Sequence, residues 1–395
     1  GRAGRVKPGH CFRFFSRNRH RGMDKYEVPE MLRTPLEGLV LQIKTLRLSG
    51  TIHEVFKSAL EPPAEQSVGA ALTTLSEIGA IDSNEELTPL GYHLAALPVD
   101  VRLGKMLLYG ALFKCVDPIV LTAATISYKS PFVAPMEQRE LADAARRAFG
   151  TASSDHLTTL NAISAWRKIR DEHGRNFERQ WCRKHFLSLE TLQTIEDMAS
   201  QFSRQLYDIG FLTERPDRRS FGLMGCSQAN KYSGNQRVIA AVLTAGLYPN
   251  VARVHRAVGT GKLSFTTGAT AQQQEVHVHP RSINHNTRGL EADWLIFHDK
   301  VKSTRVYLHD STLITPYPLL LFGGALKVSH STRRASLEGL GAEFVVAPRT
   351  AVVFKELRRH MDVMLTALIG KGVRGKHAGP PTQDEQSKLG DQGAA

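Results

Sequence analysis

Apolar residues recur at helical spacing near the start of the chain. One apolar face comes before Gly50 and consists of Leu36, Leu39, Val40, Ile43 and Leu46. Thr34 and Glu37 have the spacing of a capping box, and Pro35 stands at the first helical position. The pattern therefore predicts a helix that begins near residue 35 and ends at Gly50.

The next residues repeat this pattern in shorter pieces. A second helix is expected from Thr51, and a third over residues 64–78, ending at Gly79. Residues 80–88 have the pattern of a small hairpin, and Pro89 begins another short helix. Three helices and a hairpin in this order predict a winged-helix domain over residues 28–97.

A helical pattern continues over residues 98–212 and predicts a helical bundle. Asp100 and Asp155 each stand where a helix begins, Asp117 opens another helix with Pro118, and a last apolar face runs from Leu189 to Gly210. The polar face of this last helix carries Gln193, Gln201, Arg204 and Gln205. Two interpretations stay open for these side chains, contact with a passing nucleic-acid strand or simple solvation.

After residue 212 the pattern changes to short β-type runs. They cover residues 251–258, 263–267, 275–279, 294–298, 303–308 and 319–322. A helix that Asn235 caps and Gly246 closes comes before them. Five or six short strands with one helix favour a small barrel of the oligonucleotide-binding (OB) type over residues 213–347.

A last helix is expected over residues 350–369, within a segment 348–370. Its predicted core face consists of Leu357, Met361, Met364, Leu365 and Leu368. Residues 371–395 are rich in Gly, Lys, Pro, Gln and Asp and contain no large apolar cluster. We expect this tail to be disordered.

The first 27 residues have a different character. Residues 11–15 form an aromatic, strand-like run, which we interpret as the last strand of a domain whose bulk is missing. Arg2 and Arg5 lie before it among glycines. The arginine fork suits phosphate oxygens, and glycine lets the backbone approach an anion. The alternative is an Arg/Gly-rich disordered end.

Composition narrows the classes of function. The 395 residues are 42% hydrophobic and 23% charged, which is an ordinary globular mixture. The four cysteines are far apart, which argues against a disulfide framework or a zinc knuckle, and no apolar run is long enough to cross a bilayer. A net charge of +13 favours a polyanionic partner, with nucleic acid first. We expect no membrane partner and an intracellular location, cytoplasmic or nuclear.

Several segments in order resemble the C-terminal half of a DEAH/DExH-box RNA helicase, of helicase superfamily 2. Residues 1–5 are similar to the end of the sixth helicase motif, and residues 29–36 to the entry into the winged helix. Residues 97–105, 117–118 and 154–157 resemble the ratchet-like bundle, and residues 245–252, 279–284 and 297–302 the OB-type domain. The shared order of these segments makes the resemblance specific.

The resemblance implies a multidomain fold, mainly α with a β-barrel. In chain order it consists of the end of a second RecA-like domain (1–27), a winged helix (28–97), a ratchet-like helical bundle (98–212), an OB-type fold (213–347), a C-terminal helix (348–370) and a tail (371–395). Such a region couples ATP turnover to RNA translocation and unwinding.

The resemblance also assigns nucleotide chemistry to the first residues. Arg2 and Arg5 are expected to be the catalytic arginine fingers, and Gly1 joins them in binding the nucleotide. ATP and Mg²⁺ would be bound by the full-length parent. The chain contains no phosphate loop and no Asp-Glu-x-His box, so we expect it to bind no cofactor and to be inactive alone.

For RNA contact we expect two basic runs in the OB-type domain. They are Arg281, Ser282, Asn284 and His285, and Lys300, Lys302 and Arg305, with Arg281 and Lys302 foremost. The alternative is surface solubility. His277 and His279 share a strand face but have no further ligands in the pattern, so no metal is expected.

Two hypotheses follow for the whole chain. The first is part of an ATP-dependent RNA helicase that grips single-stranded, possibly structured RNA, with protein activators on its winged-helix or OB surface. The second is a non-catalytic RNA-binding and protein-docking module. The arginine motif favours the first, because an isolated adaptor has no evident use for it.

Overall fold

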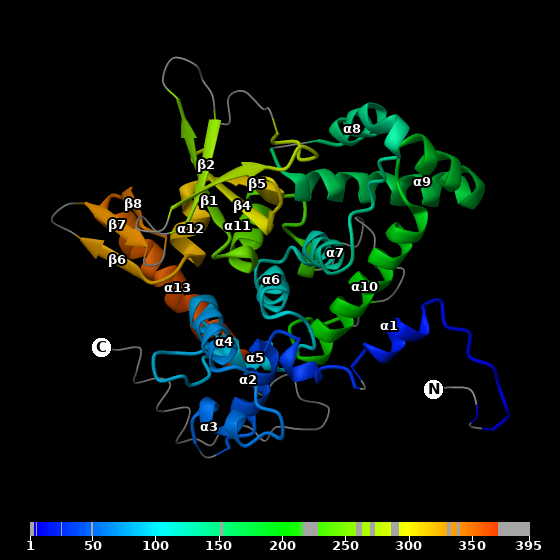
Figure 1. The fold of residues 1–395 in the computed structure, drawn as a ribbon. Coiled ribbons are helices and arrows are strands. Elements are labelled where there is room, and N and C mark those ends of the chain that lie inside the picture. Colours follow the sequence, from blue (N-terminus) through cyan, green and yellow to red (C-terminus); the bar gives the residue numbers. More distant parts are fainter. Residues whose placement is uncertain are drawn as a thin grey trace.

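The computed structural model describes residues 4, 6–24, 26–48, 50–150, 153–214, 216, 228–257, 263–268, 273–285, 292–329, 333–337 and 340–369. Figure 1 shows the barrel strands beside a central group of helices, with the first small helices on the far side of that group. Gly1, Arg2, Arg5 and the predicted tail 371–395 lie outside the described residues. In the described part of the chain, no helix is both long and apolar enough to span a membrane.

The winged-helix prediction is confirmed. Its helices are α2 (Glu37–Thr45), α3 (Ile52–Lys57), α4 (Glu65–Ile78) and α5 (Pro89–Ala95), and a bridge between Ile81 and Leu87 forms the expected hairpin. Gly79 ends α4 in the left-handed conformation, with φ of 82°, which suits glycine. Val40, Leu41 and Leu75 are fully buried and centre this part of the core.

The predicted capping box at Thr34 is wrong. The Thr34 hydroxyl donates to the Glu30 carbonyl at the 3₁₀ turn η1 (Glu30–Leu32), and α2 begins without a side-chain cap. A capping box stands at α3 instead, where the Thr51 hydroxyl accepts from Glu54 N and the Glu54 carboxylate accepts from Thr51 N at 2.7 Å. Thr34 and Glu37 have the same spacing in the sequence as Thr51 and Glu54, so the spacing did not show which pair forms the capping box.

The predicted first strand is also wrong. Residues 11–15 form no strand, and Phe12 and Phe14 are 83% and 101% exposed. Among the described strands none pairs with this segment, and a strand without a ladder is not stable in water. The one helix nearby is α1 (Arg17–Arg21), which the sequence did not predict.

The helical bundle is present as predicted. It contains α6 (Val101–Leu112), α7 (Val116–Ser127), η2 (Met136–Gln138), α8 (Arg139–Ala148), α9 (Asp155–Lys184) and α10 (Leu189–Asp208). Asp100 caps α6 by accepting from Arg102 N and Leu103 N. Most of α7 is buried because the other helices surround it, as Figure 1 shows for α6, α9 and α10.

Helix α11 (Gln236–Leu247), which follows the 3₁₀ turn η3 (Gln228–Asn230), packs on α6 at very short range. Asn235 caps α11 as predicted. A Cβ added at Gly246 would lie 2.5 Å from the Met106 Cβ, so only glycine permits this approach of the two helices.

The barrel is closed, in the order β1-β2-β3-β5-β4. Its strands are β1 (Val251–Arg256), β2 (Leu263–Thr267), β3 (Gln274–Val278), β4 (Trp294–Lys302) and β5 (Val306–Ile314). The antiparallel pairing of β1 with β4 closes the ring, and β3 pairs with β5 in parallel. The barrel interior is filled by Ala252, Val254, Phe265, Val276, Leu295, Phe297 and Leu308. The expected fold class, mainly helical with an OB-type barrel, is confirmed.

The run 319–322 is not a strand. It lies in α12 (Pro316–Phe322), which packs against α11. A continuous apolar run does not distinguish a buried strand from a buried helix, and Pro316 is typical of a helix start. A second sheet follows that the sequence did not predict, with β6 (Leu326–Ser329), β7 (Arg334–Leu337) and β8 (Ala342–Val345).

The last helix, α13 (Pro348–Leu368), is present but its predicted core face is partly wrong. Met361 and Leu365 are buried, whereas Leu357 and Met364 are 46% and 48% exposed. The helix contacts α5 and α12 along a narrow stripe, so part of its apolar surface stays uncovered. The division of the chain at the predicted domain boundaries stays a prediction.

Candidate nucleic-acid interface

The start of α9 is joined to the barrel by backbone and side-chain contacts. Ser154 forms an isolated bridge with Thr312 of β5, and Leu313 N donates to the Ser153 carbonyl at 3.1 Å. The Ser154 hydroxyl caps α9 by accepting from Leu157 N at 3.1 Å. We call residues 153–157, 279–285 and 309–313 the bundle–barrel joint.

Asp155 is the central acceptor of the bundle–barrel joint. The residue is 1% exposed, and its carboxylate accepts from Arg146 Nη2 at 3.1 Å. Four further donors reach it from the barrel side, namely Ser282 Oγ at 2.5 Å, Ser311 N at 2.9 Å, Ile283 N at 3.0 Å and Ser311 Oγ at 3.2 Å. A buried carboxylate with this many donors is well compensated, and it also faces the positive end of α9.

The structure places two predicted RNA contacts inside this network. Ser282 and Asn284 are 8% and 2% exposed. The Asn284 amide donates to the Ser311 hydroxyl at 2.9 Å and to the Ser311 carbonyl at 3.2 Å. Their side chains therefore shape the turn after β3, and an approaching strand cannot reach them without opening the joint.

The other two members of this run are accessible. Arg281 is exposed, and its backbone N donates to His279 Nδ1 at 3.2 Å, while His285 is half-buried. The His279 ring lies 4.2 Å from the His309 ring. Burial lowers the pKa of His279, and His309 and Arg281 lower it further. The face predicted for His277 and His279 thus carries an aromatic contact, and no group of three metal-ligating side chains occurs within the described ranges.

Lys300, Lys302 and Arg305 lie on the hairpin between β4 and β5. Lys300 faces Leu308 and Lys302 faces Val306 in the strand register, and all three cations are exposed. Lys300 Nζ donates to Gln274 Oε1 at 3.3 Å. Asp310 at the joint is four residues along β5 from Val306, or about 13 Å. The run of Lys300, Lys302 and Arg305 thus lies at one end of β5, away from the joint that contains the run of Arg281.

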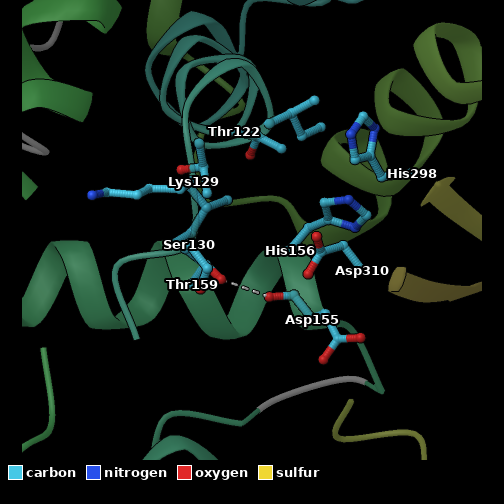
Figure 2. Close-up of a pocket in the computed structure, with 11 residues that line it drawn as sticks. Thr122, Lys129, Ser130, Asp155, His156, Thr159, His298 and Asp310 are labelled. Atoms are coloured by element: carbon cyan, nitrogen blue, oxygen red, sulfur yellow. Dashed lines mark hydrogen bonds between the residues drawn. The ribbon is translucent and has the colours of Figure 1, made fainter. Parts of the chain in front are cut away.

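A small pocket opens beside the bundle–barrel joint, with a volume of about 100 Å³ (Figure 2). The end of α7, the start of α9 and the two strands β4 and β5 line it. The lining residues are Thr122, Thr125, Ile126, Lys129, Ser130, Asp155, His156, Thr159, Leu160, His298 and Asp310. Sequence reasoning assigned none of them to a site, although residues 154–157 belonged to the family resemblance.

His156 is the most distinctive side chain of this pocket. It is 5% exposed, and its Nδ1 lies 2.7 Å from the Thr312 hydroxyl. Its Nε2 is buried and has no hydrogen-bond partner among the described residues. Burial lowers the pKa of His156, although Asp310 and Asp155 oppose this shift. The imidazole is therefore neutral at neutral pH, with one of its nitrogens unused.

The polar face of α10 lies on another part of the bundle. Gln193, Gln201 and Arg204 are exposed and Gln205 is half-buried. Arg204 Nε donates to the Ser200 carbonyl of its own helix at 3.3 Å. None of these residues lines the pocket.

A winged helix, a ratchet-like helical bundle and a closed five-stranded barrel, in this chain order, define a helicase-associated region. Matches to known families agree with this class. The winged-helix part of the helicase associated domain (HA2) matches residues 71–99, its ratchet-like part residues 100–188, and the oligonucleotide/oligosaccharide-binding (OB)-fold residues 239–326.

Curated relatives point to one group. The ATP-dependent DNA/RNA helicase DHX36 of Bos taurus is 40% identical over 367 residues, which are 92% of this chain and 35% of that protein. The human ATP-dependent RNA helicase DHX29 is 41% identical, over 92% of this chain and 26% of that protein. The Arabidopsis thaliana helicase DExH1 is 40% identical, over 93% and 35%.

The resemblance to the C-terminal half of DExH-box RNA helicases is therefore confirmed, in sequence over most of the chain and in the order of the three domains. The chain spans about a third or less of the length of these relatives.

Proposed function

We propose that this chain is the C-terminal part of an ATP-dependent RNA helicase, and that it grips single-stranded RNA along the barrel and the bundle–barrel joint. Relatives over 92% of the chain carry the names of ATP-dependent helicases. The observation that carries the RNA-gripping part is the placement of exposed cations on a closed OB-type barrel. Such a surface suits a phosphate backbone.

The RNA contacts belong to the exposed residues Arg281, Lys300, Lys302 and Arg305 and to the half-buried His285. Ser282 and Asn284 take part indirectly, because their hydrogen bonds hold the turn that presents Arg281. Each cation neutralises a phosphate, so the grip does not depend on base sequence. In the parent, this grip and the nucleotide site together would couple ATP turnover to movement along RNA.

The catalytic part of the proposal concerns Arg2 and Arg5, both outside the described residues. With Gly1 they would reach a nucleotide, ATP with Mg²⁺, held mostly by preceding domains of the parent. An arginine finger stabilises the charge that spreads over the phosphoryl oxygens, and its loss costs about 10³ to 10⁵ in rate. Arg5→Ala in the parent should therefore abolish RNA-stimulated ATP hydrolysis, and unchanged turnover would refute this role.

The proposal also covers the activity of the isolated chain, its partners and its location in the cell. The chain alone, which contains no phosphate loop, would be inactive as an ATPase. Its direct partner would be RNA, with protein activators on the winged-helix or barrel surface, and its place would be intracellular, in the cytoplasm or the nucleus.

Fluorescence anisotropy with a labelled single-stranded RNA tests the RNA grip. Arg281→Ala and Lys302→Ala should each weaken binding by about three- to tenfold, because each removes one phosphate contact. Lys57→Ala is the matched control, since Lys57 is 66% exposed but lies on α3 in the winged helix and pairs with Glu65. An equal loss in all three variants would reduce the effect to net charge and contradict the proposed surface.

A further inference from the structure

His156, whose buried Nε2 has no hydrogen-bond partner among the described residues, lines a pocket that the proposed cation contacts to RNA do not use. A buried polar atom without a hydrogen-bond partner costs free energy. Such an atom in a native structure therefore indicates that a further group, such as a ligand, can bond to it. The pocket also contains His298 and the Asp310 carboxylate. Figure 2 shows these two side chains beside the His156 ring at one end of the pocket, and Lys129 pointing away from them.

The surrounding hydrogen bonds fix which nitrogen of His156 carries the proton. Ser154 Oγ already accepts from Leu157 N, so its own proton is free for Thr312 Oγ1, 2.6 Å away. The Thr312 hydroxyl can then donate to His156 Nδ1 at 2.7 Å. If the protons run from Ser154 to Thr312 to His156, only the Nε2–H donor has no partner. If they run from His156 to Thr312 to Ser154, Nε2 has no partner and the Ser154 hydroxyl proton has no acceptor either.

The size of the pocket limits what enters it. About 100 Å³ is the space of a few water molecules and is well below the 300 Å³ or more of a typical small-molecule site. A nucleobase does not fit such a space. The edge of a sugar, or one phosphate oxygen, does.

Charge decides between these two groups. A phosphate oxygen only accepts hydrogen bonds and is negative, so the Asp310 carboxylate would repel it. The cation paired with Asp310, Arg146 Nη2 at 4.0 Å, also donates to Asp155 at 3.1 Å, and Lys129, which lines the pocket too, points away from Asp310 (Figure 2). A hydroxyl both donates and accepts, so it can accept from His156 Nε2–H and donate to Asp310. The Asp310 side chain is 45% exposed and marks the open side of the pocket.

We infer that this pocket binds the ribose 2′-hydroxyl of one nucleotide and so makes the chain prefer RNA to DNA. The inference rests on the proposed function, because a strand must already lie along the bundle–barrel joint. The 2′-hydroxyl is the group that distinguishes the two nucleic acids at any single position. His156 and Asp310 are then specificity residues, while the exposed cations hold the backbone of either strand.

The test compares the affinity of the 395-residue chain for a labelled oligouridine and for the oligodeoxyuridine of equal length, at one salt concentration. The expected preference for RNA is about tenfold, since the hydroxyl makes two hydrogen bonds, one of them to a charged group. Replacing one 2′-hydroxyl at a time by 2′-O-methyl should weaken binding at one register position.

Three variants locate the effect. His156→Asn keeps a polar atom near Thr312 but removes the donor at Nε2, and Asp310→Asn removes the charged acceptor from a partly exposed side chain. Each variant weakens or removes one of the two hydrogen bonds and should therefore lower the ratio of RNA to DNA affinity by about threefold. Asp299→Asn, on β4 but outside the pocket lining, is the matched control and should keep the wild-type ratio.

Different failures have different meanings. Equal affinity of the unmodified chain for the two strands, or an unchanged ratio in Asp310→Asn, overturns the 2′-hydroxyl pocket and leaves the RNA grip standing. A uniform gain of affinity for both strands in Asp310→Asn points to a phosphate and also overturns it. Binding to neither strand overturns the proposed function and this inference together.

Discussion

At the scale of single residues, the bundle–barrel joint depends on one carboxylate. Asp155 comes from α9, yet its donors Ser282, Ile283 and Ser311 follow it by 127 to 156 residues in the chain. The run 281–285 contains many donors, which is why the sequence indicated a binding surface there. It could not show that Ser282 and Asn284 have buried partners, because those partners come together only in the folded chain.

Asp155→Asn should destabilise the fold strongly. The amide keeps the shape but removes the charge, and one of its two polar atoms becomes a donor facing donors. Arg146 then loses its charged partner, and the donors at one of the two oxygens lose their acceptor, so we expect a loss of about 3–5 kcal/mol in the free energy of unfolding. Urea denaturation measures it. Asp143→Asn on α8 is the control and should cost less than about 0.5 kcal/mol.

Stability should also fall on the acid side because of the buried histidines. Burial lowers the pKa of His156 and of His93, so the folded state binds fewer protons than the unfolded chain just below the ordinary histidine pKa. Stability is then present above about pH 6.5 and falls with decreasing pH, by up to about 1.4 kcal/mol per pH unit for each group.

Melting temperatures between pH 8 and pH 5 measure this loss. His156→Asn should flatten the acid limb relative to the unmodified chain, because one proton-linked group is gone. His20→Asn, an exposed residue of α1, should leave the pH profile unchanged. A melting temperature of the unmodified chain that rises as the pH falls below 6.5 would contradict the assignment.

At the scale of elements, periodicity predicted most helices and the barrel strands. It failed where tertiary contacts decide the outcome. Residues 319–322 are apolar without alternation, so pattern alone could not separate a strand from α12. The sheet of β6, β7 and β8 consists of four-residue strands, which are too short for a periodic signal. The sequence also could not show which apolar residues of α13 stay exposed. The elements that pack against this helix, α5 and α12, cover only one of its sides.

The contact of α11 with α6 gives a prediction with a control of opposite sign. Gly246→Ala would bring its Cβ to 2.5 Å from the Met106 Cβ and should destabilise the chain by about 1–3 kcal/mol. Gly69→Ala in α4 meets no atom within 4 Å, and alanine favours the helix by up to about 1 kcal/mol. Thermal melting of both variants should give shifts in opposite directions. A stabilising Gly246→Ala would show that the two helices are not packed this closely.

At the scale of the whole molecule, winged helix, bundle and barrel form one continuous body with shared contacts. Arg358 of α13 donates to the carbonyls of Leu320 and Gly324 beside the barrel, and His93 of the winged helix contacts the Leu365 carbonyl. The family resemblance predicted the order of these domains. The pocket at His156 could not be predicted, because α7, α9 and two barrel strands each contribute to it.

The salt dependence of single-stranded RNA binding by the 395-residue chain tests the central claim, an RNA grip through exposed cations, most directly. Four exposed cations, Arg281, Lys300, Lys302 and Arg305, predict that the logarithm of the binding constant falls with the logarithm of the salt concentration with a slope of about −3. Removing Arg281 and Lys302 together should reduce this slope to about half. Binding that ignores salt, or no binding at low salt, would contradict the account.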